Sequence, residues 1–158
     1  MLITPHILVG TAIGVAVGNP VAGFALGVVS HYILDIIPHT DSGTWHYYEP
    51  LIGKHLDVRD FTMGIVDASV AVFSLLTLAG YAPIIGAAPL VGAFGGLLPD
   101  LVMLAGLFIP ALSKWKGLAW YYKFQNSFHY TAKPNQWILG VFTQIVAVGA
   151  SVWYLLAS

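Results

Sequence analysis

Residues 61–80, FTMGIVDASVAVFSLLTLAG, form an apolar run in which Asp67 is the only charged side chain. A run of ~20 apolar residues has the length that crosses the hydrocarbon core of a bilayer as one α-helix. The rest of the chain has the same character, with 58% hydrophobic and 8% charged residues, whereas a soluble domain carries about 25% charged residues. We therefore expect an integral membrane protein, because so few charged side chains cannot cover a water-soluble fold.

Apolar runs separated by proline, glycine and charged residues predict five helices in a single transmembrane domain over residues 1–158. The predicted helices are 4–18, 20–37, 61–80, 86–109 and 134–157. The fold class is all-α, a polytopic membrane bundle of two helical hairpins followed by a C-terminal helix. A shift of 65 positions sets Asp35 on Asp100 and Gly27 on Gly92, which we interpret as a weak internal repeat of two related hairpins that face each other.

The basic residues all fall in the two polar connections between the predicted helices. They are Lys54 and Arg59 in the first connection, and Lys114, Lys116, Lys123 and Lys133 in the second. The positive-inside rule then places both connections and the N-terminus in the cytoplasm, and the C-terminus outside the cytoplasmic (inner) membrane. A net charge of −1 and so few basic residues give no surface for nucleic acid, which we exclude as a partner.

Both connections carry further polar and aromatic side chains. In the second, an interfacial aromatic belt on a short amphipathic segment is the favoured interpretation, with substrate binding as the alternative; its residues are Trp115, Trp120, Tyr121 and Tyr122. In the first, we expect solvated loop residues at His46, His55, Asp57 and Asp60.

Ionisable side chains within membrane helices are costly and are usually paired or functional. Here they gather in the cytoplasmic half of the predicted bundle. The candidate metal ligands are His6, His31, Asp35, His39, Asp67, Asp100 and His129. His31 and Asp35 are spaced i, i+4, so both project from one helix face. An isolated carboxylate at the depth of Asp67 or Asp100 would need a partner, because burial without one costs several kcal/mol.

The ligand types restrict the metal. The chain has no cysteine, so a thiolate site is excluded and any divalent ion must be held by imidazole and carboxylate. The histidines favour Zn²⁺, with Mn²⁺, Fe²⁺ or Mg²⁺ as alternatives, and one or two ions are expected. Asp41 and Asp67 are the candidate catalytic bases. A histidine–aspartate hydrogen-bond network without metal, and an interfacial position for His6, remain the alternative interpretations.

Several motifs together resemble a known family. They are Thr4-Pro5-His6 with Gly10, the segment Ser30-His31-Tyr32-Ile33-Leu34-Asp35 followed by Pro38-His39, the Leu98-Pro99-Asp100 motif and the late His129. This pattern resembles the small inner-membrane proteins identified as membrane-bound metal-dependent hydrolases, which are distantly similar to zinc-dependent phospholipase C. The resemblance implies ligand roles for His6, His31, Asp35, Asp100 and His129. The chain departs from the family pattern because no second histidine accompanies Asp100.

The sequence thus favours a metal-dependent hydrolase of a lipid or another amphiphile, acting on an ester or phosphoester, with membrane lipid as its surroundings. Two metals that share a carboxylate would suit such hydrolysis. A cation or proton transporter or channel could use the same cluster, and a structural membrane subunit could need it only to fix helix register.

Overall fold

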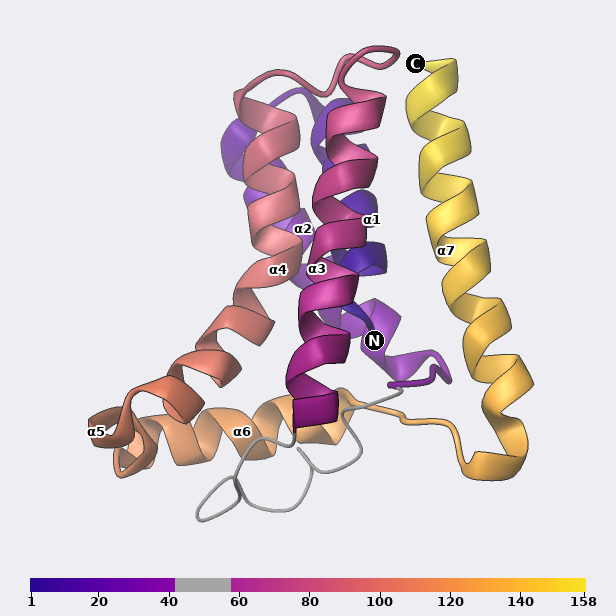
Figure 1. Cartoon of the computed structure of the whole chain (residues 1–158). Helices are drawn as coiled ribbons and strands as arrows, with labels where there is room; N and C mark the ends of the chain where they lie inside the picture. The colour runs from indigo at the N-terminus through magenta and orange to yellow at the C-terminus, as the bar shows by residue number, and fades with distance from the viewer. Residues whose placement is uncertain (42–57) are drawn as a thin grey trace.

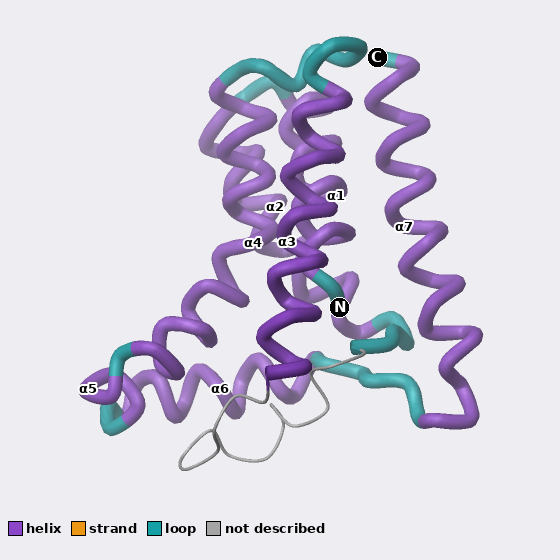
Figure 2. The backbone as a smooth tube through the Cα atoms, viewed as in Figure 1, coloured by secondary structure: helices purple, strands orange, loops and turns teal. Residues whose placement is uncertain are grey.

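The computed structural model describes residues 1–41 and 58–158, so His46, Lys54, His55 and Asp57 lie outside the described residues. The described chain is all-α, as expected (Figures 1 and 2). Its six longer helices are α1 (Ile3–Val17), α2 (Pro20–Ile36), α3 (Val58–Leu78), α4 (Ala87–Phe108), α6 (Lys116–Phe128) and α7 (Trp137–Ala157). Two short elements complete it, α5 (Pro110–Ser113) and the 3₁₀ turn η1 (Pro134–Gln136).

Three of these helices are long and apolar enough to cross a membrane. Their spans are Phe61–Leu78, Ala87–Gly106 and Trp137–Ala157. Helices α1 and α2 are also apolar but have only 15 and 17 residues. The long helices and the α1–α2 pair run in alternating directions, so both the N-terminus and α6 lie at the end of the bundle opposite the C-terminus (Figure 1). We call the end that holds the N-terminus the N-terminal end of the bundle.

The turn between α1 and α2 follows directly from the sequence. Gly18 takes a positive φ of 66°, which a glycine adopts without strain, and closes α1. Asn19 then caps α2, because its side-chain oxygen accepts hydrogen bonds from the backbone N–H groups of Val21 and Ala22 at 3.0 and 3.1 Å. Pro20 is at the first position of α2, where its missing N–H costs nothing.

Glycines bring α1 and α2 against α4. A Cβ atom at Gly10 or at Gly27 would lie 2.4 Å from the carbonyl oxygen of Gly92, so neither position has room for a side chain. Such small residues permit the close backbone approach that stabilises helix pairs in membranes. The repeat at a shift of 65 positions pairs Gly27 with Gly92, and in the structure these two glycines lie against each other. Helices α2 and α4 run in the same direction.

The structure differs from the expected second hairpin in two ways. Helix α3 packs mainly on α1, with lighter contacts to α7. Within the described part of the chain it meets α4 only through the shared core cluster in which Ala71 of α3 and Ala93 of α4 lie around Ile7. Helix α4 contains Pro99, whose ring removes a backbone hydrogen bond, and its last part turns away from the bundle (Figure 1). The chain then returns beneath the bundle as α6, a helix that the five-helix prediction lacks. Its buried residues are Leu118 and Gln125.

Candidate metal centre

The candidate ligands come together at the N-terminal end of the bundle. His6 projects from α1, His31 and Asp35 from α2, and Asp100 from the part of α4 after Pro99. The remaining two histidines, His39 and His129, follow α2 and α6. His6, His31 and His39 are fully buried, and Asp35 is 1% exposed. Four separate parts of the chain therefore contribute side chains to one buried site.

Backbone pairing fixes the segments that follow α2 and α6. The N–H of His39 donates to the carbonyl of Tyr130 at 3.3 Å, and the N–H of Ala132 donates to the carbonyl of His39 at 2.7 Å. The N–H of Tyr130 donates to the carbonyl of Asp35 at 2.8 Å. This short parallel bridge sets the side chains of His39 and His129 beside the end of α2.

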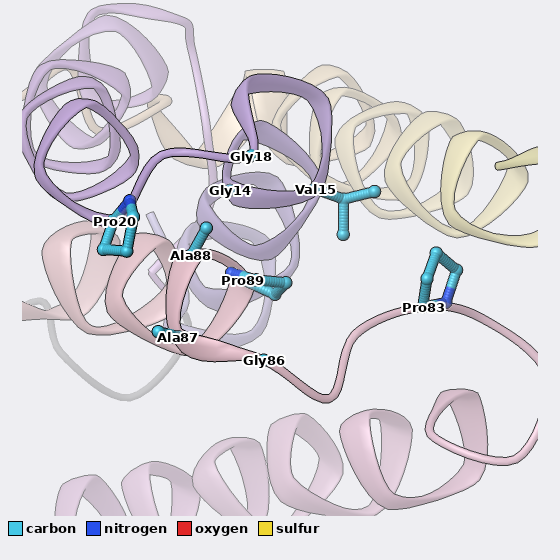
Figure 3. A pocket seen from close by; sticks show the side chains of 9 residues that line it. All are labelled: Gly14, Val15, Gly18, Pro20, Pro83, Gly86, Ala87, Ala88 and Pro89. Carbon is cyan, nitrogen blue, oxygen red and sulfur yellow. The ribbon is translucent and has the colours of Figure 1, made fainter.

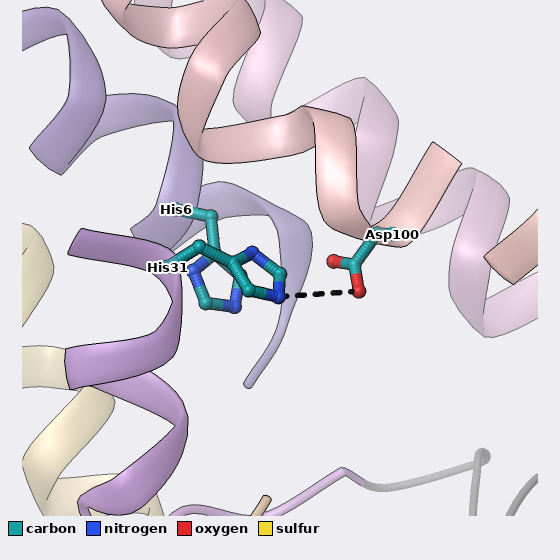
Figure 4. A group of neighbouring side chains, drawn as sticks. All are labelled: His6, His31 and Asp100. Carbon is teal, nitrogen blue, oxygen red and sulfur yellow. Dashed lines mark ion pairs between the residues drawn. The ribbon is translucent and has the colours of Figure 1, made fainter. Parts of the chain in front are cut away.

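His6, His31 and Asp100 form the first group whose side-chain atoms could hold a metal (Figure 4). The rings of His6 and His31 are stacked, with centroids 4.0 Å apart, and His31 Nε2 lies 3.7 Å from an Asp100 oxygen. The Nδ1 atom of His31 lies 2.8 Å from the carbonyl oxygen of Gly96. Because a carbonyl only accepts, Nδ1 carries a hydrogen there, and in a neutral ring Nε2 keeps the lone pair that binds a metal.

Asp35, His39 and His129 form the second group. His39 Nδ1 donates to the carbonyl of Ile37 at 2.8 Å, which again leaves Nε2 as the available nitrogen of a neutral ring. That nitrogen lies 2.8 Å from His129 Nε2, and both nitrogens approach one carboxylate oxygen of Asp41, at 3.0 and 2.6 Å. Asp41, the candidate base, therefore lies directly beside the second group.

Asp35 belongs to both groups by position. One of its oxygens lies 3.2 Å from His6 Nε2. The other lies 3.2 Å from His31 Nε2 and 3.2 Å from His129 Nδ1. A single carboxylate therefore contacts three imidazoles, two from the first group and one from the second. The oxygen near His6 also accepts a hydrogen bond of 2.5 Å from the N-terminal ammonium group of Met1.

Neighbouring groups change the pKa values of Asp41 and His129, both beside or within the second group. Burial by itself would raise the pKa of Asp41, but the ammonium group of Met1 and the neighbouring imidazoles of His129 and His39 outweigh burial and lower it. Burial would likewise lower the pKa of His129, but hydrogen bonds to Asp35 and Asp41 outweigh burial and raise it. Asp41 is thus held as a carboxylate, and His129 binds a proton more readily than a free imidazole does.

Among the residues that the structure describes, two buried side chains in or beside the first group, those of His6 and Gln125, have polar atoms without a hydrogen-bond partner. Both ring nitrogens of His6 lack one, since Nε2 is close to Asp35 but not aligned for a hydrogen bond, and so does Oε1 of Gln125. Unpaired polar atoms are costly in a protein interior. Imidazole nitrogens and carboxylate oxygens that face one another also repel unless a proton or a cation lies between them. The ammonium group of Met1, 2.5 Å from an Asp35 oxygen and 3.5 Å from an Asp41 oxygen, supplies one such cation. It does not reach the first group of His6, His31 and Asp100, whose imidazole and carboxylate atoms fit a divalent transition metal.

The structure differs from the sequence prediction at two residues, Asp67 and Gln125. Asp67 is in neither group: its carboxylate accepts hydrogen bonds from the backbone of Ile3 and Thr4 and from the Thr4 hydroxyl, the last at 2.6 Å. It caps the start of α1. Gln125 was not predicted, yet its Nε2 lies 3.3 Å from His31 Nε2 and 3.4 Å from Asp100 Oδ1. Gln125 is four residues before His129, so a predicted helix at α6 would have placed the two side chains on the same side.

A hollow of about 360 Å³ lies at the other end of the bundle (Figure 3). Glycine, proline, alanine and valine side chains line it: Gly14, Val15, Gly18, Pro20, Pro83, Gly86, Ala87, Ala88 and Pro89. None of their side chains can act as an acid, a base or a metal ligand, so this hollow carries no catalytic group.

Comparisons with known proteins add no relative. No family model matches the chain, and no curated protein and no solved structure is significantly similar to it. What can be said of its function therefore rests on the site itself.

Proposed function

We propose that this chain is a membrane-embedded, metal-dependent hydrolase that acts on an ester or phosphoester of a lipid or another amphiphile. The observation that carries the proposal is the position of Asp35, whose two carboxylate oxygens contact histidines of both buried groups. Hydrolases that use two ions commonly place a shared carboxylate between them. The proposal includes membership in the family of membrane-bound metal-dependent hydrolases, which the motifs around His6, His31 and Asp100 support.

The ligand assignment follows from the two groups. His6, His31 and Asp100 would hold one ion, and His39 and His129 the other, with Asp35 between them. Zn²⁺ is the first choice for such imidazole and carboxylate ligands, with Mn²⁺ and Fe²⁺ next. An ion of this kind supplies Lewis acidity, which polarises a phosphoryl or carbonyl oxygen and acidifies water.

Residues around the ligands have supporting roles. The carbonyl oxygens of Gly96 and Ile37 orient His31 and His39 by accepting from their Nδ1 atoms. Asp41 is the candidate general base, because its carboxylate is beside His39 and His129 without belonging to either group of ligands. Asp67 is a weaker candidate, since backbone and hydroxyl donors already engage its carboxylate.

The position of the site near one end of the candidate membrane spans favours an amphiphilic substrate. The ligands come from α1, α4, the end of α2 and the segment after α6. Helix α4 is long and apolar enough to cross a membrane, and α6 runs beneath the bundle (Figure 1). A lipid whose head group is at the membrane surface would present its ester or phosphoester bonds at about this depth. The basic residues around α6, Lys114, Lys116, Lys123 and Lys133, support a position in the cytoplasmic leaflet of the inner membrane under the positive-inside rule.

A transporter for cations or protons is the rival function. The hydrogen-bonded chain from His39 through His129 to Asp35 favours it, since such chains conduct protons. The rest of the bundle does not continue this chain, because residues 7–30, 68–99 and 137–158 contain no Asp, Glu, Lys, Arg or His. A proton path would therefore end inside the membrane, and we prefer the enzyme.

Metal content of the purified protein tests the proposal. We expect one or two transition-metal ions per chain by elemental analysis in detergent, and loss of metal in a His31→Ala, Asp35→Ala double variant. Asn126→Ala, an exposed change at the same end of the bundle, is the matched control and should keep its metal. Metal-bound protein is then assayed on phosphoester and glycerophospholipid substrates, with the double variant as the blank.

Each other outcome assigns a different function. Absence of metal from a folded wild type would contradict the hydrolase. Ion flux into proteoliposomes that Asp100→Asn abolishes would favour the transporter. A double variant that loses stability although the wild type holds no metal would indicate a structural subunit.

A further inference from the structure

Helix α6 has one face that is attached to the bundle. Leu118 and Gln125 on this face are buried. The hydroxyl of Tyr121 donates to the carbonyl of Pro99 at 3.1 Å, and that of Tyr122 donates to the carbonyl of Met103 at 2.9 Å. These contacts fix α6 against the part of α4 that follows the bend, so the orientation of its other face is also set.

The opposite face is basic and aromatic. Lys116, Trp120, Lys123 and Phe124 recur at i, i+4, i+7 and i+8, which places them in one stripe of the helix, and all four are exposed. Lys114 and Trp115, also exposed, come just before the helix. We call these six residues the basic face of α6. Residues 110–128 contain three lysines and neither Asp nor Glu, so the segment has a charge of +3.

The place of α6 in the chain sets the depth of this face. The span Ala87–Gly106 ends shortly before α6, and the span Trp137–Ala157 begins shortly after it. Helix α6 runs across the same end of the bundle as these span ends (Figure 1). It therefore lies at the boundary between the hydrocarbon core and water, where phospholipid head groups are the neighbours. Tryptophan is enriched at this depth, and lysine attracts anionic lipids there.

We propose that the basic face of α6 binds the head groups of anionic phospholipids. Lys114, Lys116 and Lys123 supply the charge complementarity, while Trp115 and Trp120, 64% and 66% exposed, insert at the level of the glycerol backbone. Each lysine at an anionic surface strengthens binding about fivefold, so three together give roughly a hundredfold. The proposal does not depend on the metal or on the reaction.

Native mass spectrometry of the full chain in detergent micelles tests it. The protein is titrated with phosphatidylglycerol, which is anionic, and with phosphatidylcholine, which has no net charge. We expect phosphatidylglycerol to bind at least about tenfold more tightly. The triple variant Lys114→Gln, Lys116→Gln, Lys123→Gln should lose this preference. These lysines are exposed, so we expect the variant to keep the helix content of the wild type, measured by circular dichroism.

Two matched variants separate this face from general electrostatics. The triple Lys→Arg variant at the same positions keeps the charge and should keep the preference. Lys133→Gln, an exposed lysine beyond the basic face, should also keep it. Equal binding of the two lipids by the wild type, or an undiminished preference in the triple Gln variant, would overturn the proposal. Binding of soluble polyglutamate without any lipid preference would also overturn it and assign the face to an acidic protein.

Discussion

The Nδ1 atom of His31 donates a hydrogen bond of 2.8 Å to the carbonyl oxygen of Gly96, so one contact orients a candidate ligand and joins α2 to α4. Gly96 is also one of the glycines through which α4 contacts α1, because a Cβ atom there would lie 2.4 Å from the carbonyl oxygen of His6. The glycine packing and the candidate metal centre thus depend on the same residue.

Gly96→Ala should therefore damage both packing and metal binding. The added methyl group meets backbone that cannot move aside, and overpacking of this kind costs about 1–3 kcal/mol. We expect a lower melting temperature in detergent and a reduced metal content, since His6 and His31 are displaced together. Gly149→Ala in α7 is the control, because nothing lies within 4 Å of a Cβ atom there. An unchanged metal content in Gly96→Ala would separate the helix interface from the site.

Asp67 should act on stability and not on metal content. Its carboxylate caps the start of α1, where Thr4 donates from both its backbone and its hydroxyl. Loss of a helix cap costs about 0.5–2 kcal/mol, so Asp67→Ala should lower the free energy of unfolding by about that amount. Ser69→Ala, on the exposed side of the same helix, should leave it unchanged. Loss of metal from a folded Asp67→Ala protein would instead restore Asp67 as a ligand.

Gln125 should tune metal affinity through its neighbours. Its amide lies within 3.4 Å of His31 Nε2 and Asp100 Oδ1, and it comes from a helix that covers the site. An ion on His31 Nε2 would displace the amide from that nitrogen and leave its hydrogen bond to Asp100, and partners that orient a ligating carboxylate change affinity by about 10–100-fold when they are replaced. We expect that loss in Gln125→Leu, measured by competition with a chelator, whereas the exposed neighbour in Asn126→Leu should have no effect. Equal affinities of the two variants would show that Gln125 only fills space.

Metal affinity should fall as the pH falls. Without metal, the pKa of His129 is raised above that of a free imidazole, so a proton occupies the ring over a wider range of pH. Metal binding requires the neutral ring and releases that proton. Below the raised pKa, affinity should decrease by about tenfold per pH unit for each proton displaced. The pKa of Asp41 is lowered, so Asp41 stays ionised over this range. Calorimetric titrations at several pH values measure the slope, and a flat profile would exclude His129 as a ligand.

The sequence predicted five of the helices because long apolar runs, glycine turns and proline starts are local signals. It also predicted the gathering of His6, His31, Asp35, Asp100 and His129 at one end, since their positions along successive antiparallel helices require it. It did not predict that α3 packs mainly on α1, with α4 reached only through the shared cluster around Ile7. In a membrane helix the lipid-facing and bundle-facing sides are equally apolar, so hydrophobic periodicity does not identify the partner.

A different reason explains why helix α6 was not predicted. Its aromatic and basic composition indicates an interfacial segment, but the bend of α4 after Pro99 decides that this segment returns beneath the site. The position of Gln125 depends on that return. Contacts between residues far apart in the chain, such as the one between Gln125 and Asp100, depend on tertiary packing that local sequence patterns do not encode.

Asp35 should differ from every other ligand in how much metal it controls. Its carboxylate contacts His6 and His31 of the first group and His129 of the second, each at 3.2 Å. Asp35→Asn preserves the size of the side chain but removes the charge, so we expect both ions to be lost. Asp100→Asn affects the first group alone, and His39→Ala the second alone. Each of these should keep one ion per chain, measured by elemental analysis on protein whose helix content matches the wild type. If Asp35→Asn keeps one ion, the two groups do not share a carboxylate. If Asp100→Asn and His39→Ala each lose all metal, the cluster holds a single ion to which both groups contribute.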